Sequence, residues 1–289
     1  MNWSGVWTAL LTPFRNGAVD EASLEKLFAH QVKNGVRGFV INGTTGESPV
    51  LSREERERIF KLARAQTKVS LMMGTGTNDT AETVRRTQEA QAMGADAALV
   101  VVPYYNKPPQ RGLVEHFRAV ASCTTLPIFL YNVPGRTITG LTVESIAELA
   151  KVKNIVGIKE ATGNIERAQW LIQEAPEDFA IYSGDDPTAI ALMYCGGRGN
   201  VSVTANVAPK LMHELCVAAI AGSTVEANRI QKHLMPLHRA LFLEANPIPV
   251  KWAMQRMGLC GGALRLPLTP LSLSVQAQVE SALVAAQLL

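Results

Sequence analysis

Residues 154–174, NIVGIKEATGNIERAQWLIQE, contain one complete unit of the fold. The run NIVGIK at residues 154–159 is short and aliphatic, as in a buried strand. A polar turn follows, and residues 164–174 have the apolar spacing of a helix. A buried strand that leads through a turn into a helix is the βα unit of parallel sheets.

The same pattern occurs eight times along the chain. The strand signals are VWTALLT (6–12), GFVIN (38–42), KVSLMM (68–73), AALVVV (97–102), PIFLYN (127–132), NIVGIK (154–159), FAIYS (179–183) and GNVSV (199–203). Helical segments lie between and after them, near 20–34, 52–66, 79–93, 110–122, 142–150, 164–174, 186–194 and 207–221.

Eight such units with strands apolar enough to be covered on both faces predict an α/β fold with parallel strands. The economical interpretation is a closed (β/α)8 TIM barrel over residues 1–222, because such barrels typically take ~250 residues. Residues 223–289 are predicted to be a C-terminal helical region packed on the barrel. A doubly wound open sheet with a helical appendix fits the same pattern.

Composition and charge exclude several classes of protein. The 289 residues are 47% hydrophobic and 18% charged with a net charge of +3, which is typical of a folded globular chain. Basic residues in 52–68 alternate with acidic ones at helical spacing, which predicts a solvated helix face and no nucleic-acid partner. No apolar stretch has bilayer-spanning length and the start lacks a signal pattern, so we expect a cytoplasmic protein with no membrane partner.

The four cysteines and five histidines show no metal-ligand spacing. We therefore expect neither a disulfide framework nor a bound metal, and no other feature of the chain predicts a cofactor.

In a TIM barrel the reactive side chains lie at the C-terminal ends of the strands. Polar segments follow the predicted strands at these ends: GTTGES (43–48), GTGTND (74–79), PYYN (103–106), YNVPGRT (131–137), SGDD (183–186) and TAN (204–206). The sixth strand is unusual because it ends on a lysine, Lys159.

Alternation along this strand predicts where the lysine points. Ile155, Gly157 and Lys159 should share one face, and Val156 and Ile158 the other. If the aliphatic pair faces the helices, the lysine points into the mouth of the barrel. Partial burial there favours a neutral amine, which can attack a ketone and form a Schiff base. The alternative is an ordinary lysine that reaches into solvent.

Schiff-base chemistry needs a group that moves protons on and off the reacting atoms. Tyr131, at the end of the neighbouring strand, is a candidate, and Thr44, Tyr104 and Tyr105 offer hydroxyl groups for a proton relay. Read alone, each is equally an aromatic or polar residue of the barrel rim.

Two further features suit carboxylates. The GTTGES segment offers backbone N–H groups and hydroxyls, although its pattern also fits a tight turn without a ligand. Arg136 offers a forked donor, unless it is a surface ion-pair residue. Together these residues predict an enzyme that joins a keto acid, held as an imine on Lys159, to an aldehyde that carries its own carboxylate.

The motifs GTTGES, PYYN, YNVPGRT, GIKEATGN, SGDD, SVTANV and NPIPVKWA occur in an order and spacing that resemble the dihydrodipicolinate synthase family. The resemblance covers nearly the whole chain from about Trp3. It implies a TIM barrel with C-terminal helices and a homotetramer built as a dimer of dimers. It also implies condensation of pyruvate with aspartate 4-semialdehyde to 4-hydroxy-tetrahydrodipicolinate, on the diaminopimelate route to lysine.

The resemblance implies four catalytic residues. Lys159 would form the imine and Tyr131 would move protons. Thr44 and Tyr105 would complete the relay, with Tyr105 reaching in from the partner subunit.

It also implies three substrate-binding residues and a border residue. Thr45 would bind the pyruvate carboxylate, and Val201 would offer a backbone carbonyl near the keto acid. Arg136 would receive the carboxylate of the semialdehyde, and Gly184 would border the site.

In inhibited members of this family, lysine binds at the dimer interface beside the active-site tyrosines. The matching positions are Ser48, Pro49, Arg53, Arg56, Asn78, Glu82 and Tyr104. Inhibited members commonly carry His or Glu where this chain has the two arginines, whose positive charge would weaken binding of the lysine ammonium group. The alternative is that these arginines swing into solvent or pair with Glu54, Glu55 or Glu57. We therefore predict weak or absent inhibition by lysine, and greater sensitivity in an Arg56→Glu variant.

Two alternatives stay open. N-acetylneuraminate lyases and 2-keto-3-deoxy sugar acid aldolases share the lysine and the tyrosine but act on polyhydroxylated aldehydes; Arg136 favours an aldehyde with a carboxylate instead. The barrel could also be a non-catalytic binding or regulatory protein. The argument against this alternative is the joint presence of Lys159, Tyr131, Thr44 and Tyr105.

Overall fold

The computed structural model describes residues 3–289, and its centre is a closed barrel of eight parallel strands in the order β1-β10-β9-β8-β7-β6-β5-β4. These strands are β1 (Gly5–Ala9), β4 (Gly38–Ile41), β5 (Ser70–Gly74), β6 (Ala97–Val101), β7 (Ile128–Asn132), β8 (Ile155–Glu160), β9 (Ala180–Ser183) and β10 (Gly199–Ser202). Because β1 pairs with both β4 and β10, the sheet has no open edge. The predicted TIM barrel is confirmed, and the open doubly wound sheet is wrong.

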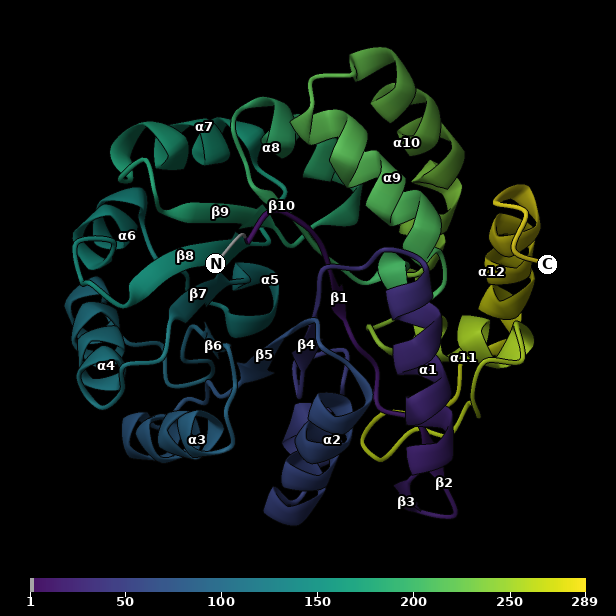
Figure 1. Ribbon diagram of the computed structural model, residues 1–289, viewed down its shortest axis with the longest axis horizontal. Coiled ribbons are helices and arrows are strands. Elements are labelled where there is room, and N and C mark those ends of the chain that lie inside the picture. The colour runs from purple at the N-terminus through teal and green to yellow at the C-terminus, as the bar shows by residue number, and fades with distance from the viewer. Residues whose placement is uncertain (1–2) are drawn as a thin grey trace.

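The helices form a ring around the strands (Figure 1). They are α1 (Glu21–Lys33), α2 (Arg53–Gln66), α3 (Thr80–Ala92), α4 (Gln110–Ser122), α6 (Val143–Leu149), α7 (Ile165–Glu174), α8 (Ala189–Tyr194) and α9 (Pro209–Ile220). Ser52 starts α2 with a reciprocal capping box to Glu55, and the side chains of Asp79 and Thr142 accept backbone N–H bonds at the starts of α3 and α6. Local capping chemistry therefore sets where these helices begin.

Short elements in the connecting loops were not predicted, because two to four residues are too few to show a period. They are a hairpin of β2 (Phe14–Arg15) and β3 (Ala18–Val19), the one-turn α5 (Pro134–Thr137), and the 3-10 turns η1 (Ser48–Val50), η2 (Asp186–Thr188) and η3 (Thr204–Asn206). The first strand is also shorter than predicted. It ends at Ala9. The Leu10 N–H still donates to the Val40 carbonyl of β4, but the Leu11 N–H donates to the Asn206 side chain instead.

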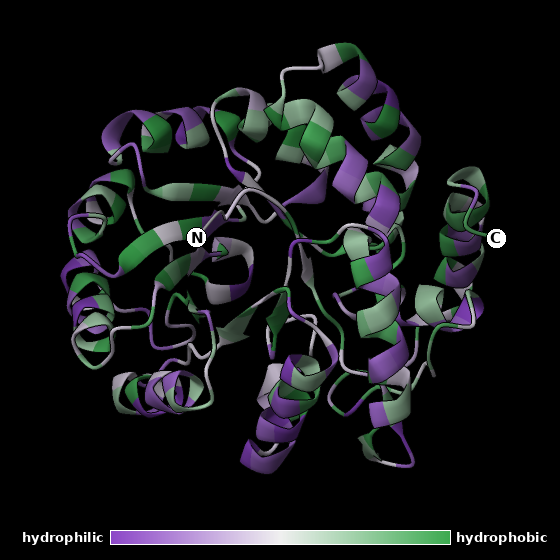
Figure 2. Ribbon diagram, viewed as in Figure 1, coloured by the Kyte–Doolittle hydropathy of each residue, from purple (hydrophilic) through white to green (hydrophobic). Residues whose placement is uncertain are grey.

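The apolar core has two parts, one inside the barrel and one between the strands and the helices. Figure 2 shows the strands mostly in the hydrophobic colour, whereas the surrounding helices carry both colours. The cluster inside the barrel contains Trp7, Ala9, Val40, Met72, Ala97, Leu99, Phe129, Tyr131, Ala180, Tyr182 and Val201.

A β-bulge interrupts the pairing of β7 with β8. Ile128 pairs with Ile155 but Phe129 pairs with Gly157, so β8 contains one extra residue. Ile155 therefore packs in the outer cluster, and Val156 packs against the inner one. The expected strict alternation is wrong at these two positions, because a bulge shifts the phase of a strand by one residue.

Three helices follow the barrel: α10 (Thr224–Ala240), α11 (Ile248–Arg256) and α12 (Leu273–Ala285). They lie on one side of the ring (Figure 1), with α10 packed on α9, and α12 packed on α10 and α11. Within residues 3–289, no helix combines the length and apolar character needed to cross a bilayer.

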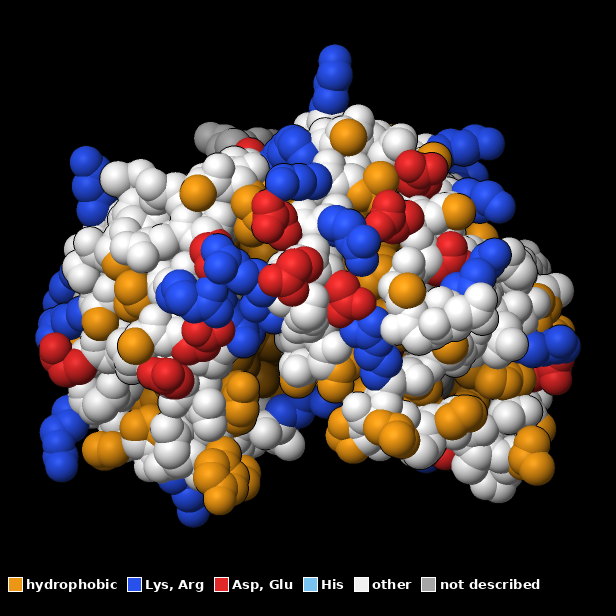
Figure 3. Space-filling view, turned by 90° about the horizontal axis from the view of Figure 1, so that it is seen from below, with side chains coloured by type: hydrophobic (Ala, Val, Ile, Leu, Met, Phe, Trp, Pro, Cys, Tyr) orange, Lys and Arg blue, Asp and Glu red, His pale blue; other side chains and the backbone are white. Residues whose placement is uncertain are grey.

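Charged side chains of both signs are interspersed on the face shown in Figure 3. On α2, for example, Lys61 pairs with Glu57 at 2.6 Å, and Arg58 lies 3.5 Å from Glu21 of α1. The basic residues of this helix therefore have acidic neighbours, as their alternation in the sequence predicts. Hydrophobic side chains gather on both sides of a hollow at the lower edge of this view.

Candidate active site

A cavity of about 210 Å³ lies among the C-terminal ends of the barrel strands and the loops that follow them. It is smaller than the ~300–1,000 Å³ pockets that hold drug-sized ligands, so it suits a small molecule. Six of the residues singled out in the sequence line it: Thr44, Thr45, Tyr131, Arg136, Lys159 and Gly184.

Lys159 and Tyr131 lie next to each other in the wall of this cavity. They are paired across the β7–β8 ladder and are only 6% and 7% exposed. The Nζ atom of Lys159 lies 4.4 Å from the centroid of the Tyr131 ring, a distance at which the ring face attracts a cation. Gly184 leaves room for the lysine, since a Cβ atom there would lie 2.7 Å from Lys159 Cε. The amine is thus confined beside the phenol ring.

A buried carboxylate, which was not predicted from the sequence, joins the ends of the same two strands. Glu160 is 2% exposed and accepts two bonds from Asn132 Nδ2, at 3.0 and 3.3 Å. Arg167 Nε donates to it at 3.1 Å and the Thr162 N–H at 3.0 Å. Because Asn132 and Glu160 directly follow the candidate tyrosine and lysine, this network fixes the strand ends that carry them.

Asn246 connects two predicted substrate-binding residues. Its Nδ2 donates to Thr45 Oγ1 at 2.9 Å, and its carbonyl accepts from Arg136 Nη2 at 3.1 Å. Sequence reasoning did not assign this asparagine. The motif NPIPVKWA, which contains this asparagine, could have pointed to it. However, the motif follows the last barrel strand, and its spacing gave no reason to place Asn246 at the mouth of the barrel.

Tyr105 lies outside the cavity of this chain. It is 85% exposed, and its φ of +73° turns the loop away after β6. Within a single chain the structure therefore does not bring Tyr105 to Lys159.

Val201 is 2% exposed and belongs to the cluster inside the barrel, and it does not line the cavity. The cavity wall after β10 is formed by Val203 instead, and Gly184 and Asp185 form the wall after β9. Gly184 thus borders the cavity as expected, whereas Val203 and Asp185 were missed.

The predicted regulatory positions fall into separate regions. Ser48, Pro49 and Tyr104 line a neighbouring cavity of about 430 Å³, which also contacts Arg136. Asn78 does not line this cavity; it lies in the loop before α3, where its carbonyl accepts from Asn106 Nδ2 at 2.8 Å.

Arg53 and Arg56 line a different cavity, of about 160 Å³. Arg53 pairs with Glu89 at 2.9 Å, so its partner is not one of the neighbouring glutamates in the sequence. Arg56 is buried, and its Nη1 donates to the Leu51 carbonyl at 2.8 Å. Burial, together with the charge of the nearby Arg86, lowers the pKa of the Arg56 guanidinium.

Glu82 already has two basic partners on its own helix, α3. Arg85 donates to it at 2.7 and 2.8 Å, and Arg86 at 2.6 Å. The hydrogen bonds from Arg85 and Arg86 lower the pKa of the Glu82 carboxyl to about 2, although partial burial opposes them. Its negative charge is therefore compensated within the chain.

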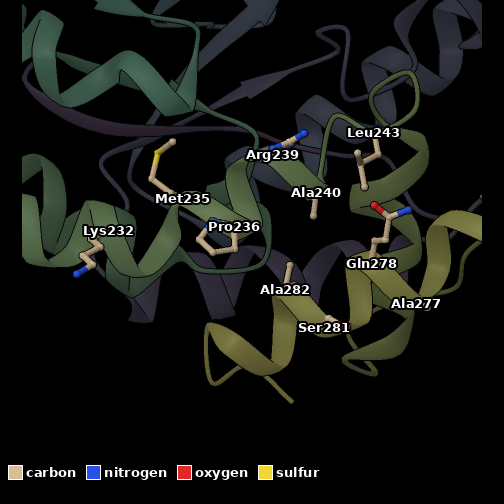
Figure 4. Close-up of a pocket in the computed structure, with 10 residues that line it drawn as sticks. All are labelled: Lys232, Met235, Pro236, Arg239, Ala240, Leu243, Ala277, Gln278, Ser281 and Ala282. Carbon is tan, nitrogen blue, oxygen red and sulfur yellow. The ribbon is translucent and has the colours of Figure 1, made fainter.

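A hollow of about 850 Å³ lies elsewhere, between α10 and α12. Met235, Pro236 and Leu243 face it together with Lys232 and Arg239 (Figure 4). No residue proposed for catalysis, substrate binding or regulation lines it. Across residues 3–289, no three His, Cys, Asp or Glu side chains are grouped closely enough to hold a metal ion.

The dihydrodipicolinate synthetase family matches residues 2–286 of the chain. The 4-hydroxy-tetrahydrodipicolinate synthase of Acidovorax sp. (strain JS42) is 57% identical over 290 residues, which cover 99% of this chain and 97% of that protein.

Solved structures are similar over the same length. The chloride-inhibited dihydrodipicolinate synthase from Acinetobacter baumannii, complexed with pyruvate, has a TM-score of 0.97 and 45% identity, and 99% of each chain is covered. The enzyme from Cyanidioschyzon merolae with lysine bound has a TM-score of 0.96 and 41% identity, again over 99% of each chain.

Proposed function

The chain belongs to the dihydrodipicolinate synthetase family, and on this premise we propose that its cavity holds pyruvate as an imine on Lys159 and joins it to aspartate 4-semialdehyde. The reaction is that of a 4-hydroxy-tetrahydrodipicolinate synthase, a lyase of lysine and diaminopimelate biosynthesis. One observation carries the residue assignment: the Lys159 amine lies 4.4 Å from the Tyr131 ring centroid in a cavity that Thr44 and Thr45 also line.

The first half of the reaction activates pyruvate. The Lys159 amine attacks the keto carbon, and the resulting carbinolamine loses water to give the imine. Tyr131 and Thr44 move the protons that these steps require. The Thr45 hydroxyl and the N–H groups of its turn hold the pyruvate carboxylate. Loss of a methyl proton then converts the imine into a nucleophilic enamine.

The second half forms the carbon–carbon bond. The enamine carbon attacks the aldehyde carbon of the semialdehyde, whose oxygen takes a proton. The amino group of the semialdehyde then attacks the imine carbon and displaces the Lys159 amine, which closes the ring and frees the enzyme. Arg136 binds the carboxylate of the semialdehyde, since a guanidinium can donate two parallel bonds to it. Asn246 holds Arg136 in the direction of the cavity.

We further propose that Tyr105 completes the proton relay of a neighbouring subunit, in a homotetramer built as a dimer of dimers that works in the cytoplasm. The family resemblance supports this assembly. An aromatic ring that is 85% exposed and lies outside the cavity of its own chain fits a role in another chain. The Val201 carbonyl, behind the cavity wall, is assigned to the keto-acid side of the site.

The names of the relatives favour the carboxylate-bearing aldehyde over the sugar-like aldehydes considered from the sequence. Relatives at 50–57% identity are named 4-hydroxy-tetrahydrodipicolinate synthase, and none of these is named a sugar acid aldolase. A non-catalytic barrel has no comparable support.

Borohydride trapping tests the imine. The protein is incubated with pyruvate alone and reduced, and its mass and peptides are measured. We expect one reduced pyruvate unit per chain, on the Lys159 peptide. Lys159→Arg, which keeps the charge, should abolish the label, whereas Lys153→Arg at an exposed loop position should keep it. A label on another lysine, or none, would overturn the proposal.

A further inference from the structure

A second buried lysine lies close to the active-site loop but does not line the 210 Å³ cavity. Lys251 of α11 donates to Glu47, and both side chains have 0% exposure. The Lys251 Nζ atom also lies 4.4 Å from the centroid of the Phe14 ring. The second carboxylate oxygen of Glu47 accepts from the Arg265 N–H at 3.1 Å. Both charges are therefore compensated inside the protein.

The backbone of Glu47 indicates that its side chain is needed. Its φ of 55° and ψ of 39° are left-handed, a conformation that is strained for an L-residue and that glycine adopts readily. Strained conformations persist where the surroundings hold them, and here the buried pair does so.

Glu47 closes the turn that carries the two threonines of the site. Its N–H donates to the Thr44 carbonyl at 3.1 Å, and its own carbonyl accepts from the Val50 N–H at 3.0 Å. Thr45 lies between these points and is held from the other side by Asn246. The position of the Glu47 carboxylate therefore determines how the turn lies against the cavity.

Asn246 and Lys251 belong to one short segment of the C-terminal region, at the start of α11. Asn246 holds the threonine hydroxyl, and Lys251 holds the glutamate two residues further along the turn. The segment therefore contacts the loop of residues 43–48 at two points. Both of these contacts come from residues that follow the barrel.

We propose that Lys251 is a positioning residue for the reaction: through Glu47 it holds the turn so that Thr44 and Thr45 face the Lys159 amine. This inference rests on the proposed function. It makes the C-terminal helical region a working part of the active site, because the region orients a loop that binds pyruvate.

Three variants separate positioning from simple charge balance: Lys251→Met, Glu47→Gln, and both together. Removal of one partner leaves the other buried and unpaired, so each single variant should unfold at a lower temperature. The double variant removes both charges and should recover most of this loss. Its dissociation constant for pyruvate, from borohydride trapping at increasing pyruvate, should nevertheless stay raised tenfold or more, and KM for pyruvate should rise more than kcat falls.

Lys232→Met on the exposed side of α10 is the matched control, because it removes a lysine from the same region without touching the loop. Amide hydrogen exchange in residues 43–51 gives a readout that does not depend on catalysis. It should be faster in the double variant than in the control, and unchanged in strands β5 and β6.

The outcomes are distinct. A double variant with recovered melting temperature and unchanged pyruvate affinity would overturn the positioning role. If Lys251→Met does not fold, the volume-preserving Glu47→Gln and the double variant decide the question. Failure of the unmodified protein to trap pyruvate would instead overturn the proposed function.

Discussion

At the scale of single residues, the site depends on a phenol and an amine held against each other. Tyr131 is confined by the barrel interior, so Phe at this position should fit without changing the fold. It would remove the hydroxyl that moves protons, and we expect kcat to fall by about 10²–10⁴-fold, as is typical of lost acid–base catalysis. Steady-state kinetics measures the effect.

Tyr182→Phe is the control for this variant. Tyr182 is paired with Lys159 on the other side of β8 and is equally buried, but it does not line the cavity. Its variant should keep kcat within a few-fold. Equal losses in both variants would mean that the barrel core, and not the Tyr131 hydroxyl, is responsible.

Gly184 gives a second prediction. A Cβ atom at this position would lie 2.7 Å from both Lys159 Cε and Ala161 Cβ, closer than such atoms approach. The lysine side chain is the more flexible neighbour, so Gly184→Ala should displace it and slow imine formation at least tenfold. Gly135→Ala, where a Cβ meets nothing within 4 Å, is the control. Normal trapping of pyruvate by the Gly184 variant would contradict this prediction.

At the scale of strands and helices, repetition made the fold predictable. Each strand is a short apolar run and several of the helices have a capped start, so eight units could be recognised without knowledge of their contacts. The bulge in β8 could not be predicted, because an extra residue is visible only against its partner strand. For the same reason Asn246 and Glu47 were missed: both act through contacts between segments far apart in the chain.

Helix α3 bears on the predicted response to lysine. Glu82 is already bound by two arginines, and Arg86 also lines the 430 Å³ cavity. A like charge about 4 Å from a ligand ammonium costs ~1 kcal/mol in water and ~4 kcal/mol at an effective dielectric of 20. We expect little inhibition below millimolar lysine at saturating pyruvate.

Arg86→Gln should increase sensitivity to lysine, because it removes a positive charge from the wall of the 430 Å³ cavity and leaves Glu82 with Arg85 as its one remaining basic partner on α3. Arg118→Gln on α4, where the arginine makes similar pairs with Glu115 and Glu148, is the control. Strong inhibition of the unmodified enzyme at submillimolar lysine would contradict the charge argument.

Helices α3 and α4 also predict a response to acid. His116 is 5% exposed, and its Nδ1 lies 2.9 Å from the Thr80 hydroxyl. Burial lowers its pKa to about 4, although Asp79 opposes this shift. The unfolded chain, with a pKa near 6.5, takes up the proton first. The contribution of neutral His116 to the free energy of unfolding is therefore fully present above pH 6.5 and is lost as the pH falls toward 4.

The loss from this histidine should reach about 2 kcal/mol at pH 5. Urea unfolding at pH 7 and at pH 5 measures the free energy of unfolding at each pH. In the His116→Gln variant, the difference between these two free energies should be smaller by about 2 kcal/mol. His233→Gln on α10 is the control. An unchanged difference in the His116 variant would show that other groups cause the acid sensitivity.

At the scale of the whole molecule, one proposed catalytic residue is out of place in a single chain. If Tyr105 serves a neighbouring subunit, mixed dimers of Tyr105→Phe and Lys159→Arg chains contain one site with an intact lysine and an intact tyrosine. Such hybrids should regain activity that neither parent has. Differently tagged chains, purified as hybrids and assayed, test this.

Hybrids of Tyr131→Phe with Lys159→Arg are the control, since both of these residues act within one chain. They should stay inactive. Verified hybrids of the Tyr105 variant that show no recovery would place this tyrosine outside the shared site.

The closure of the barrel has a consequence for synthesis on the ribosome. One side of β1 stays unpaired until β10 has been synthesised. The Asn206 side chain, which donates to the Ala9 carbonyl, lies 197 positions further along the chain. Until about residue 202 has emerged, the nascent sheet has two unpaired edges, which can pair with other chains. The growing polypeptide is therefore most exposed to aggregation just before its last strand is made.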